Sequence, residues 1–150
     1  MEILQYSQEH MEFRNKVRTF MQNEITPNVD QWEKEKIMPK SAWKRMGDAG
    51  LLCTTIPAKY GGLEKDFLHA IILAEEIVHT DHNGQGPVTH SDIVVPYITS
   101  FASEELKKKY LPGCISGDII TSVAMSEPAV GSDLASIATT AEEIGDEVII

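Results

Sequence analysis

The stretch DFLHAIILAEEIVHT, residues 66–80, carries the strongest helical pattern in this sequence. Its apolar side chains recur at spacings of three and four, the period that places them along one side of an α-helix. The residues on that side are Phe67, Ile71, Ala74, Ile77 and Val78. We therefore predict an amphipathic helix that packs this apolar stripe into a core formed with other helices.

The sequence before this helix shows the same period. Ser7 is a good N-terminal cap for a first helix. The apolar stripe of that helix consists of Phe13, Val17, Phe20, Met21 and Ile25. Pro27 suits the first turn of a second helix. Ser41 is expected to cap a third helix, which Gly50 would end.

Helical signals also continue after residue 80. HSDIVVPYITSFA, residues 90–102, is apolar all round, and its internal Pro96 is expected to kink the helix or end it. SEELKKKYLP, residues 103–112, is expected to form a short helix that Ser103 caps and Pro112-Gly113 closes.

Strand signals replace helical ones near Gly117. DIITSVAMS, SIATTAEEI and EVII are β-branched or threonine-rich and are separated by turn residues. The predicted fold is mainly α: an up-and-down-like helical domain over residues 1–117, then the first strands of a β domain over residues 118–150. Because the chain stops at Ile150 within an apolar strand, we expect the β domain to be incomplete and the chain to be truncated.

Composition and charge exclude several classes of protein. The chain has 150 residues, 42% of them hydrophobic, which is enough for a domain with a core. Its formal net charge is -10, whereas a nucleic-acid binder needs a basic patch. There is no run of about 18 apolar residues that would suggest a membrane span, and residues 1–10 lack the pattern of a signal peptide. Cys53 and Cys114 are expected to be reduced thiols rather than a disulfide.

The chemical candidates before the strand-like region are weak. HTDHN, residues 79–83, contains possible metal ligands, but histidine also suits a helix C-terminus and no further Cys or His completes a ligand set, so we expect no metal site. The GQG of residues 84–86 follows a helix rather than a strand, which argues against a dinucleotide fingerprint. Glu75 and Glu76 would point about 100° apart on a helix and are not expected to form a catalytic dyad. His90 is expected to be a core histidine with satisfied hydrogen bonds.

The loop AMSEPAVGSD, residues 124–133, is the most informative stretch for function. Ser126 offers a hydroxyl and Glu127 a carboxylate, and Gly131-Ser132 exposes backbone N–H groups beside a second hydroxyl. Such groups together can form a cradle for phosphate or pyrophosphate oxygens. The same composition suits a plain surface turn in which Asp133 caps its neighbours, and the residues alone leave both interpretations open.

The wider stretch AMSEPAVGSDLAS, residues 124–136, closely resembles the signature of the flavin-dependent acyl-CoA dehydrogenases. Further similarity lies in family order along essentially the whole chain: YGG at 60–62, EEI at 75–77, HSDIVVPYI at 90–98, SEELKKKYLPG at 103–113 and GDEVII at 145–150. The stretches around His90 and Ser126 look most like the long-chain-type branch.

The resemblance implies an N-terminal helical domain, a middle β domain and a C-terminal helical bundle, of which this chain would hold the first and the start of the second. It implies FAD-dependent α,β-dehydrogenation of a fatty acyl-CoA to a trans-2-enoyl-CoA, with electrons passed to an electron-transfer flavoprotein. The family's catalytic base lies on a later helical segment, so no catalytic residue is expected here, Glu127 included, and the chain is expected to be inactive alone. The resemblance further implies a homotetramer or homodimer, in the bacterial cytoplasm or, after processing, the mitochondrial matrix.

The resemblance also implies binding roles for individual positions. The residues implied to meet the flavin are Val123, Ala124, Met125 and Ser126. The residues implied to lie near the FAD pyrophosphate and the CoA arm are Gly131 and Ser132. The residues implied to line the acyl pocket are Val88, His90 and Val94.

One position departs from the signature. The family usually has a small residue before the Gly-Ser pair, where this chain has Val130. A β-branched residue stiffens the backbone and tolerates φ > 0 poorly. If the loop needs φ > 0 or a close phosphate approach at this position, FAD binding would be weakened; alternatively, the Val130 side chain would simply point outward.

Two alternatives retain the helical fold. An acyl-CoA oxidase-like flavin enzyme would pass its electrons to oxygen. A non-catalytic helical domain used for assembly or binding would have lost its flavin site, and Val130 is the feature that favours it.

Overall fold

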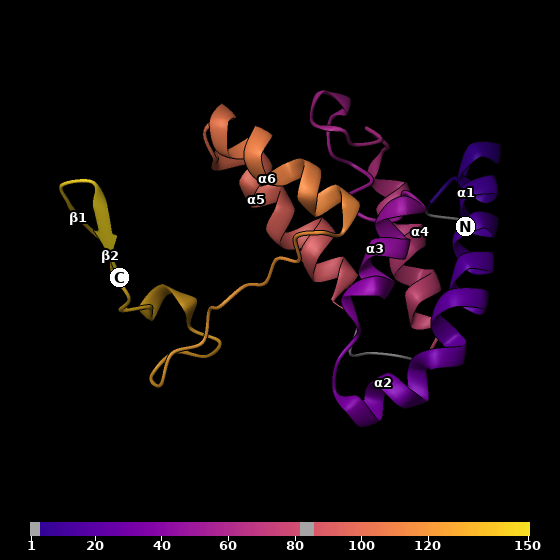
Figure 1. Ribbon diagram of the computed structural model, residues 1–150, viewed down its shortest axis with the longest axis horizontal. Helices are drawn as coiled ribbons and strands as arrows, with labels where there is room; N and C mark the ends of the chain where they lie inside the picture. The colour runs from indigo at the N-terminus through magenta and orange to yellow at the C-terminus, as the bar shows by residue number, and fades with distance from the viewer. Residues whose placement is uncertain (1–3, 82–85) are drawn as a thin grey trace.

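The structure is a computed structural model that describes residues 4–81 and 86–150. The α-helices are α1 (Gln8–Phe20), α2 (Val29–Glu35), α3 (Lys40–Asp48), α4 (Phe67–Val78), α5 (Val95–Phe101) and α6 (Glu104–Ser116). The π-helical and 3₁₀ segments are η1 (Met21–Ile25), η2 (Thr26–Asn28), η3 (Ala58–Tyr60), η4 (Thr89–Val94) and η5 (Leu134–Ser136). The strands are β1 (Glu142–Ile144) and β2 (Glu147–Ile149). The helices form one body, and the chain leaves it as an extended segment that ends in the β1–β2 hairpin (Figure 1). The predicted fold class is confirmed.

Helix α1 carries the apolar stripe that its sequence predicts. Ser7 caps it, accepting a hydrogen bond from the backbone N–H of His10, and Val17 is fully buried. The stripe continues without a break into η1, where Met21 and Ile25 are buried in the same core. The apolar stripe that was predicted from the sequence is therefore also the face that packs into the tertiary core.

Helix α4 packs along α1, but the predicted stripe is wrong at its two ends, although its member Ile77 is buried. Phe67 and Val78 are 67% and 64% exposed, whereas Ile72 and Leu73 are buried. The sequence pattern could not predict which side of α4 is buried, because apolar residues lie on nearly every side of this helix. The buried side instead includes His69 and Glu76, polar residues whose partners come from elsewhere in the fold.

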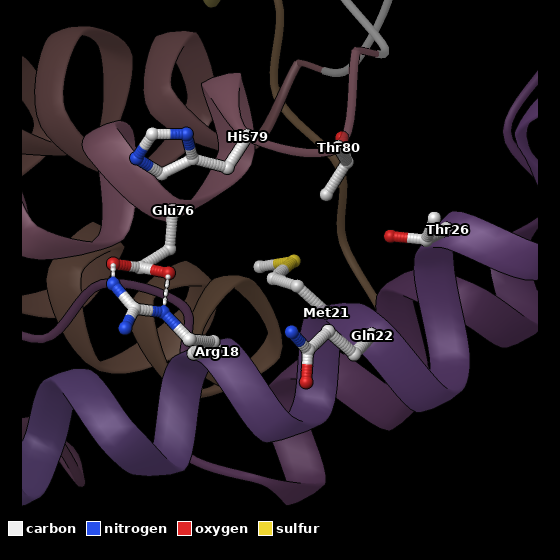
Figure 2. A pocket seen from close by; sticks show the side chains of 7 residues that line it. All are labelled: Arg18, Met21, Gln22, Thr26, Glu76, His79 and Thr80. Carbon is white, nitrogen blue, oxygen red and sulfur yellow. Dashed lines mark hydrogen bonds and ion pairs between the residues drawn. The ribbon is translucent and has the colours of Figure 1, made fainter.

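An ion-pair network centred on the buried Glu76 carboxylate joins α1 to α4. Arg18 donates from Nε and Nη2 to the two carboxylate oxygens of Glu76 at 2.9 and 2.8 Å (Figure 2). Arg14 donates to Glu76 Oε1 at 3.1 Å. The Glu76 side chain is only 1% exposed, whereas that of Glu75 is 43% exposed. Burial pushes the pKa of Glu76 upward, but the hydrogen bonds from Arg18 and Arg14 outweigh it and lower the pKa. The network, and not an acid–base dyad, accounts for the paired glutamates.

Two predicted helix boundaries are wrong. Helix α3 begins at Lys40 after Pro39, so Ser41 lies inside it and does not cap it. Helix α6 runs through Pro112 to Ser116. A proline inside a helix removes one backbone hydrogen bond, but the flanking Leu111 and Cys114 are fully buried, and this packing keeps the helix continuous.

Gly117 ends α6 and sets its distance from α3. Its φ is +76°, a left-handed conformation that glycine adopts most readily. A Cβ at this position would lie 2.4 Å from the carbonyl oxygen of Trp43 in α3. The glycine is therefore required both by the chain reversal and by the close approach of the two helices.

Pro96 lies in the first turn of α5, directly after the π-helical segment η4. Pro96 does not end the helix, which continues to Phe101. The hydrogen bonding changes from π-helical to α-helical just before the proline, whose missing N–H is tolerated in a first turn.

The region after Gly117 contains less strand than predicted. β1 and β2 pair antiparallel around a turn at Gly145, whose φ is +64°. The stretch 120–126, predicted as a strand, is extended but has no strand partner among the described residues. Strand assignment needs a hydrogen-bonded neighbour, which the sequence pattern cannot supply. Within the described part of the chain, no helix is long and apolar enough to cross a membrane.

Candidate functional site

The signature loop is organised around a tight turn from Glu127 to Val130. The Glu127 N–H donates to the Val130 carbonyl at 3.2 Å and the Val130 N–H donates back to the Glu127 carbonyl at 3.0 Å. Pro128 and Ala129 therefore form the tip of the turn, where the fixed φ of proline suits the chain reversal.

The Glu127 carboxylate closes a second, larger loop. It accepts hydrogen bonds from the backbone N–H groups of Ala138 and Thr139, both at 2.9 Å, and from the Thr139 hydroxyl. These bonds, led by that from the Thr139 hydroxyl, lower the pKa of Glu127. A carboxylate held ionised by three donors is poorly suited to remove a proton from a substrate, so its role here is to hold the loop together.

Val130 does not adopt the positive φ that a β-branched residue would tolerate poorly. It is not among the described residues with positive φ, and its side chain is covered, with the residue only 4% exposed, although it is not part of the helical core. The outward orientation considered from the sequence is therefore wrong. A β-branched residue suits this position because the backbone is not left-handed and the side chain is covered.

The adjoining Gly131 and Ser132 are exposed. Nothing lies within 4 Å of the place that a Cβ on Gly131 would occupy, so there is room for another molecule to approach the backbone. The carboxylate of Asp133 accepts a hydrogen bond from the Ser136 hydroxyl. The loop is therefore a surface turn with one open side, and the Asp133 side chain does not cap the following helical turn. The cradle interpretation stays a prediction.

An apolar cavity of about 370 Å³ lies between the helices and the extended segment. Its lining residues are Ile93, Val94, Tyr97, Val123 and Met125. We call it the exit groove, because the chain leaves the helical body along it. It brings together an acyl-pocket candidate, Val94, and two flavin-contact candidates, Val123 and Met125. Ala124 and Ser126 do not line it, in keeping with the alternating directions of side chains in an extended chain.

Sequence reasoning missed two residues of the exit groove, Ile93 and Tyr97. Both are exposed helical apolar residues, and they are spaced i, i+4, so they lie on one side of the helix. That spacing could have singled them out beside Val94.

His90 does not line the exit groove. It is fully buried, and its Nδ1 accepts a hydrogen bond from the backbone N–H of Thr121 at 3.1 Å. The proton of the neutral ring is therefore on Nε2, which donates to the Cys114 carbonyl at 3.0 Å. Burial lowers the pKa of His90. The core-histidine interpretation agrees with this geometry, and the ring ties η4 to the extended segment just before Val123.

Other candidate positions lie outside the groove. Val88 is half-buried against the helical core. Cys53 and Cys114 are both buried free thiols, as predicted, and burial raises the pKa of Cys53 to about 12, which makes it a poor nucleophile. His79 caps the C-terminus of α4; of the neighbouring candidates, His82 and the first two residues of GQG lie outside the described residues.

A second cavity, of about 380 Å³, lies between α1–η1 and the end of α4 (Figure 2). Its lining residues are Arg18, Met21, Gln22, Thr26, Glu76, His79 and Thr80. Arg18 is turned toward Glu76 and paired with it, so its charge is already neutralised. This cavity offers no anion site comparable to the open loop at Gly131.

Comparison with known proteins identifies the family. Residues 7–118 match the family described as acyl-CoA dehydrogenase, N-terminal domain. The chain belongs to the acyl-CoA dehydrogenase family. It is 39% identical over 145 residues to the mitochondrial long-chain specific acyl-CoA dehydrogenase of Sus scrofa. The aligned region covers 97% of this chain and 34% of that protein. The chain therefore spans about a third of the length of such curated relatives.

Solved structures of acyl-CoA dehydrogenases have the same fold. The crystal structure of an acyl-CoA dehydrogenase from Geobacillus kaustophilus matches with a TM-score of 0.91 at 44% identity, covering 99% of this chain and 38% of that one. A glutaryl-CoA dehydrogenase from Mycobacterium smegmatis, solved in complex with FADH2, matches with a TM-score of 0.87 at 25% identity, covering 95% and 37% of the two chains.

Proposed function

We propose that this chain forms the flavin-facing and acyl-facing N-terminal part of an FAD-dependent dehydrogenase that converts a fatty acyl-CoA into a trans-2-enoyl-CoA. The observation that carries the proposal is the exit groove. It places Val94, from the helical region, against Val123 and Met125, from the signature region, around one apolar cavity. An apolar cavity beside a polar loop suits a ligand with a hydrocarbon chain and a phosphate-bearing end.

The open side of the loop fits the polar part of such a ligand. Gly131 and Ser132 would face the FAD pyrophosphate and the CoA arm, since a phosphate can approach the uncrowded Gly131 backbone. The unpaired extended backbone around Ala124 and the Ser126 hydroxyl would meet the polar edge of the flavin. When bound, FAD supplies the hydride acceptor for the β-hydrogen of the substrate.

The helical side would form the wall of the acyl pocket. Val94 lines the groove directly, with Ile93 and Tyr97 beside it. His90 and Val88 lie behind this wall, and we propose that they shape it indirectly. Because His90 bonds to Thr121 on one side and belongs to η4 on the other, it would hold the acyl wall and the flavin-facing segment in a constant relative position.

The catalytic base and the remaining flavin contacts are proposed to lie outside these 150 residues, in the part of the relatives that this chain does not span. Residues 1–117 would form the helical domain and residues 118–150 the start of a β domain. The proton α to a thioester is weakly acidic, so its removal requires hydrogen bonds that stabilise the developing enolate. We propose that the electrons pass to an electron-transfer flavoprotein and that the full-length protein is a homotetramer or homodimer.

The decisive experiment uses the full-length protein. Wild type should purify yellow with FAD and reduce a dye acceptor when given a long-chain acyl-CoA. Gly131→Ala should lose FAD or bind it more weakly without loss of thermal stability, because the added methyl group enters only the open side of the loop. A Gly131→Ala variant that retains FAD as wild type does would contradict the assignment of this loop.

The same assays separate the alternatives. Turnover with oxygen at the rate seen with the dye would indicate an oxidase. A colourless full-length protein that cannot be reconstituted with FAD would indicate a non-catalytic domain. The 150-residue chain alone is expected to show no turnover and little FAD retention after desalting.

A further inference from the structure

We propose that His10, Asp66 and His69 form a binding site for a divalent cation of the Zn²⁺ type. The three residues come from two helices that lie side by side, α1 and α4 (Figure 1). His10 is in the first turn of α1, Asp66 is the N-cap of α4, and His69 is in the first turn of α4. The site shares no residue with the exit groove, and the proposal is independent of the proposed function.

The potential ligand atoms converge. His10 Nε2 lies 3.0 Å from both Asp66 oxygens, and His69 Nδ1 lies 2.8 Å from Asp66 Oδ1. One ligand atom from each residue lies within 4.8 Å of the others. Ligands of a tetrahedral Zn²⁺ ion, at about 2.0 Å from the metal, are about 3.3 Å apart. Small side-chain movements would therefore suffice to admit an ion among two imidazoles and a carboxylate, the N and O ligands that Zn²⁺ accepts.

The protonation pattern of this cluster leaves one nitrogen unsatisfied. The Ser7 backbone N–H donates to His10 Nδ1 at 3.0 Å, which puts the proton of the neutral ring on Nε2, facing Asp66. His69 Nδ1 also faces Asp66. Its other nitrogen, Nε2, is buried and has no hydrogen-bond partner among the described residues. A buried imidazole nitrogen without a partner is unfavourable and indicates that the cluster is incomplete as it stands.

Metal binding would turn this nitrogen into a donor on the side of the Glu9 carboxylate. A cation bound at His69 Nδ1 moves the ring proton to Nε2, which lies 3.9 Å from the Glu9 carboxylate. A cation at His10 Nε2 moves that proton to Nδ1, which lies 2.9 Å from the Ser7 hydroxyl; the contact with the Ser7 N–H is then given up. Metal-bound His10 would thus have an oxygen acceptor for its second nitrogen at hydrogen-bond distance, and His69 would gain one by a movement of the Glu9 side chain from 3.9 Å, the arrangement usual for metal-ligating histidines.

The neighbouring charges permit a cation. Lys65 is a nearby positive group, and it is paired with Glu9. The N-termini of α1 and α4 also carry partial positive charge at the site, which the Asp66 carboxylate offsets. The Asp66 side chain is 58% exposed, which leaves a path for the ion to enter and a position for water as a fourth ligand.

The test is a calorimetric titration of tag-free, EDTA-treated protein with ZnCl₂. We expect saturable binding with one ion per chain, weakened at least about tenfold by His69→Ala and by Asp66→Asn. Asp66→Asn serves as the second variant should His69→Ala fail to fold, because Asn also caps helices well. His79→Ala, which removes an exposed histidine at the other end of α4, should bind as wild type does.

A second readout distinguishes ligation from a structural role. Long-range ¹H–¹⁵N spectra of the histidine rings should show the His10 proton on Nε2 without metal and on Nδ1 with Zn²⁺. Absence of saturable binding, wild-type affinity in Asp66→Asn, or loss of binding only in His79→Ala would overturn the proposal.

Discussion

The Glu127 carboxylate accepts a hydrogen bond from the backbone N–H of Thr139 at 2.9 Å and another from the Thr139 hydroxyl. The acidic residue of the signature therefore holds together a loop of the chain that follows it. Because the same carboxylate also binds the Ala138 N–H, the loop carrying Gly131 and Ser132 is closed at its base.

Replacing this carboxylate should loosen the loop. In Glu127→Gln only one side-chain oxygen remains as an acceptor, so at least one of the three donors loses its partner. We expect faster amide hydrogen exchange at Ala138 and Thr139 and little change in the helices. Glu147→Gln, in the exposed β2 strand, is the matched control. If both amides exchange as slowly in Glu127→Gln as in wild type, the Glu127 carboxylate does not hold the loop closed.

The ion-pair network centred on Glu76 predicts a large asymmetry between two adjacent glutamates. Glu76→Gln leaves Arg14 and Arg18 without their shared buried partner and should lower the free energy of unfolding by about 3 kcal/mol. Glu75→Gln removes only a pair at the surface and should change it by less than about 1 kcal/mol. Urea unfolding of the two variants measures the difference, and equal effects would show that the network contributes nothing special.

His90 should make stability depend on pH. Burial lowers its pKa in the folded state, so the unfolded chain, with a histidine pKa of about 6.5, binds the proton more readily. Stability is therefore greatest above about pH 6.5 and falls as the pH drops through and below that value. The test compares the melting temperatures of wild type and His90→Gln from about pH 8 to about pH 5, the range in which histidine titrates. As the pH falls, the melting temperature of wild type should decline more steeply than that of the variant. Parallel curves would mean that His90 does not contribute.

The same substitution should destabilise the protein at Gly117 and leave its stability nearly unchanged at Gly131. Gly117→Ala places a methyl group against the Trp43 carbonyl and requires an alanine at φ +76°, so the protein should lose at least about 1 kcal/mol of stability. Gly131→Ala meets no atom within 4 Å and should stay within about 0.5 kcal/mol of wild type. Thermal unfolding compares them, and a tolerated Gly117→Ala would show that α3 and α6 can move apart freely.

The helices of this protein follow largely from local sequence. The stripe from Phe13 to Ile25, the cap at Ser7 and the change of character near Gly117 are short-range signals, and each corresponds to an element or boundary in the structure. The family resemblance was equally accessible, because it rests on short motifs, the signature among them, that each span a few neighbouring residues. Prediction failed where local signals were weak or were overridden by packing, as at Pro112.

The candidate site could be predicted only in part. Val94, Val123 and Met125 were chosen from sequence as binding candidates, and the structure brings all three to one cavity. The three-dimensional structure was needed to show that Val130 is buried and that Glu127 bonds to Ala138 and Thr139. It was also needed to show that Ile93 and Tyr97 line the groove. These contacts join segments that are separated in the sequence, so no local pattern predicts them.

The sequence by itself determined which segments are helical, where the helical region ends and to which family the signature belongs, because periodicity, caps and motifs act over a few residues. Only the tertiary structure decided which face of α4 is buried. In a helix that is apolar on nearly every side, hydrophobic burial favours no face strongly. The choice therefore fell to the polar partners: Arg14 and Arg18 reach Glu76 from α1, and His10 reaches Asp66 beside His69. Those contacts join residues more than fifty positions apart in the chain, a distance over which sequence pattern carries no information.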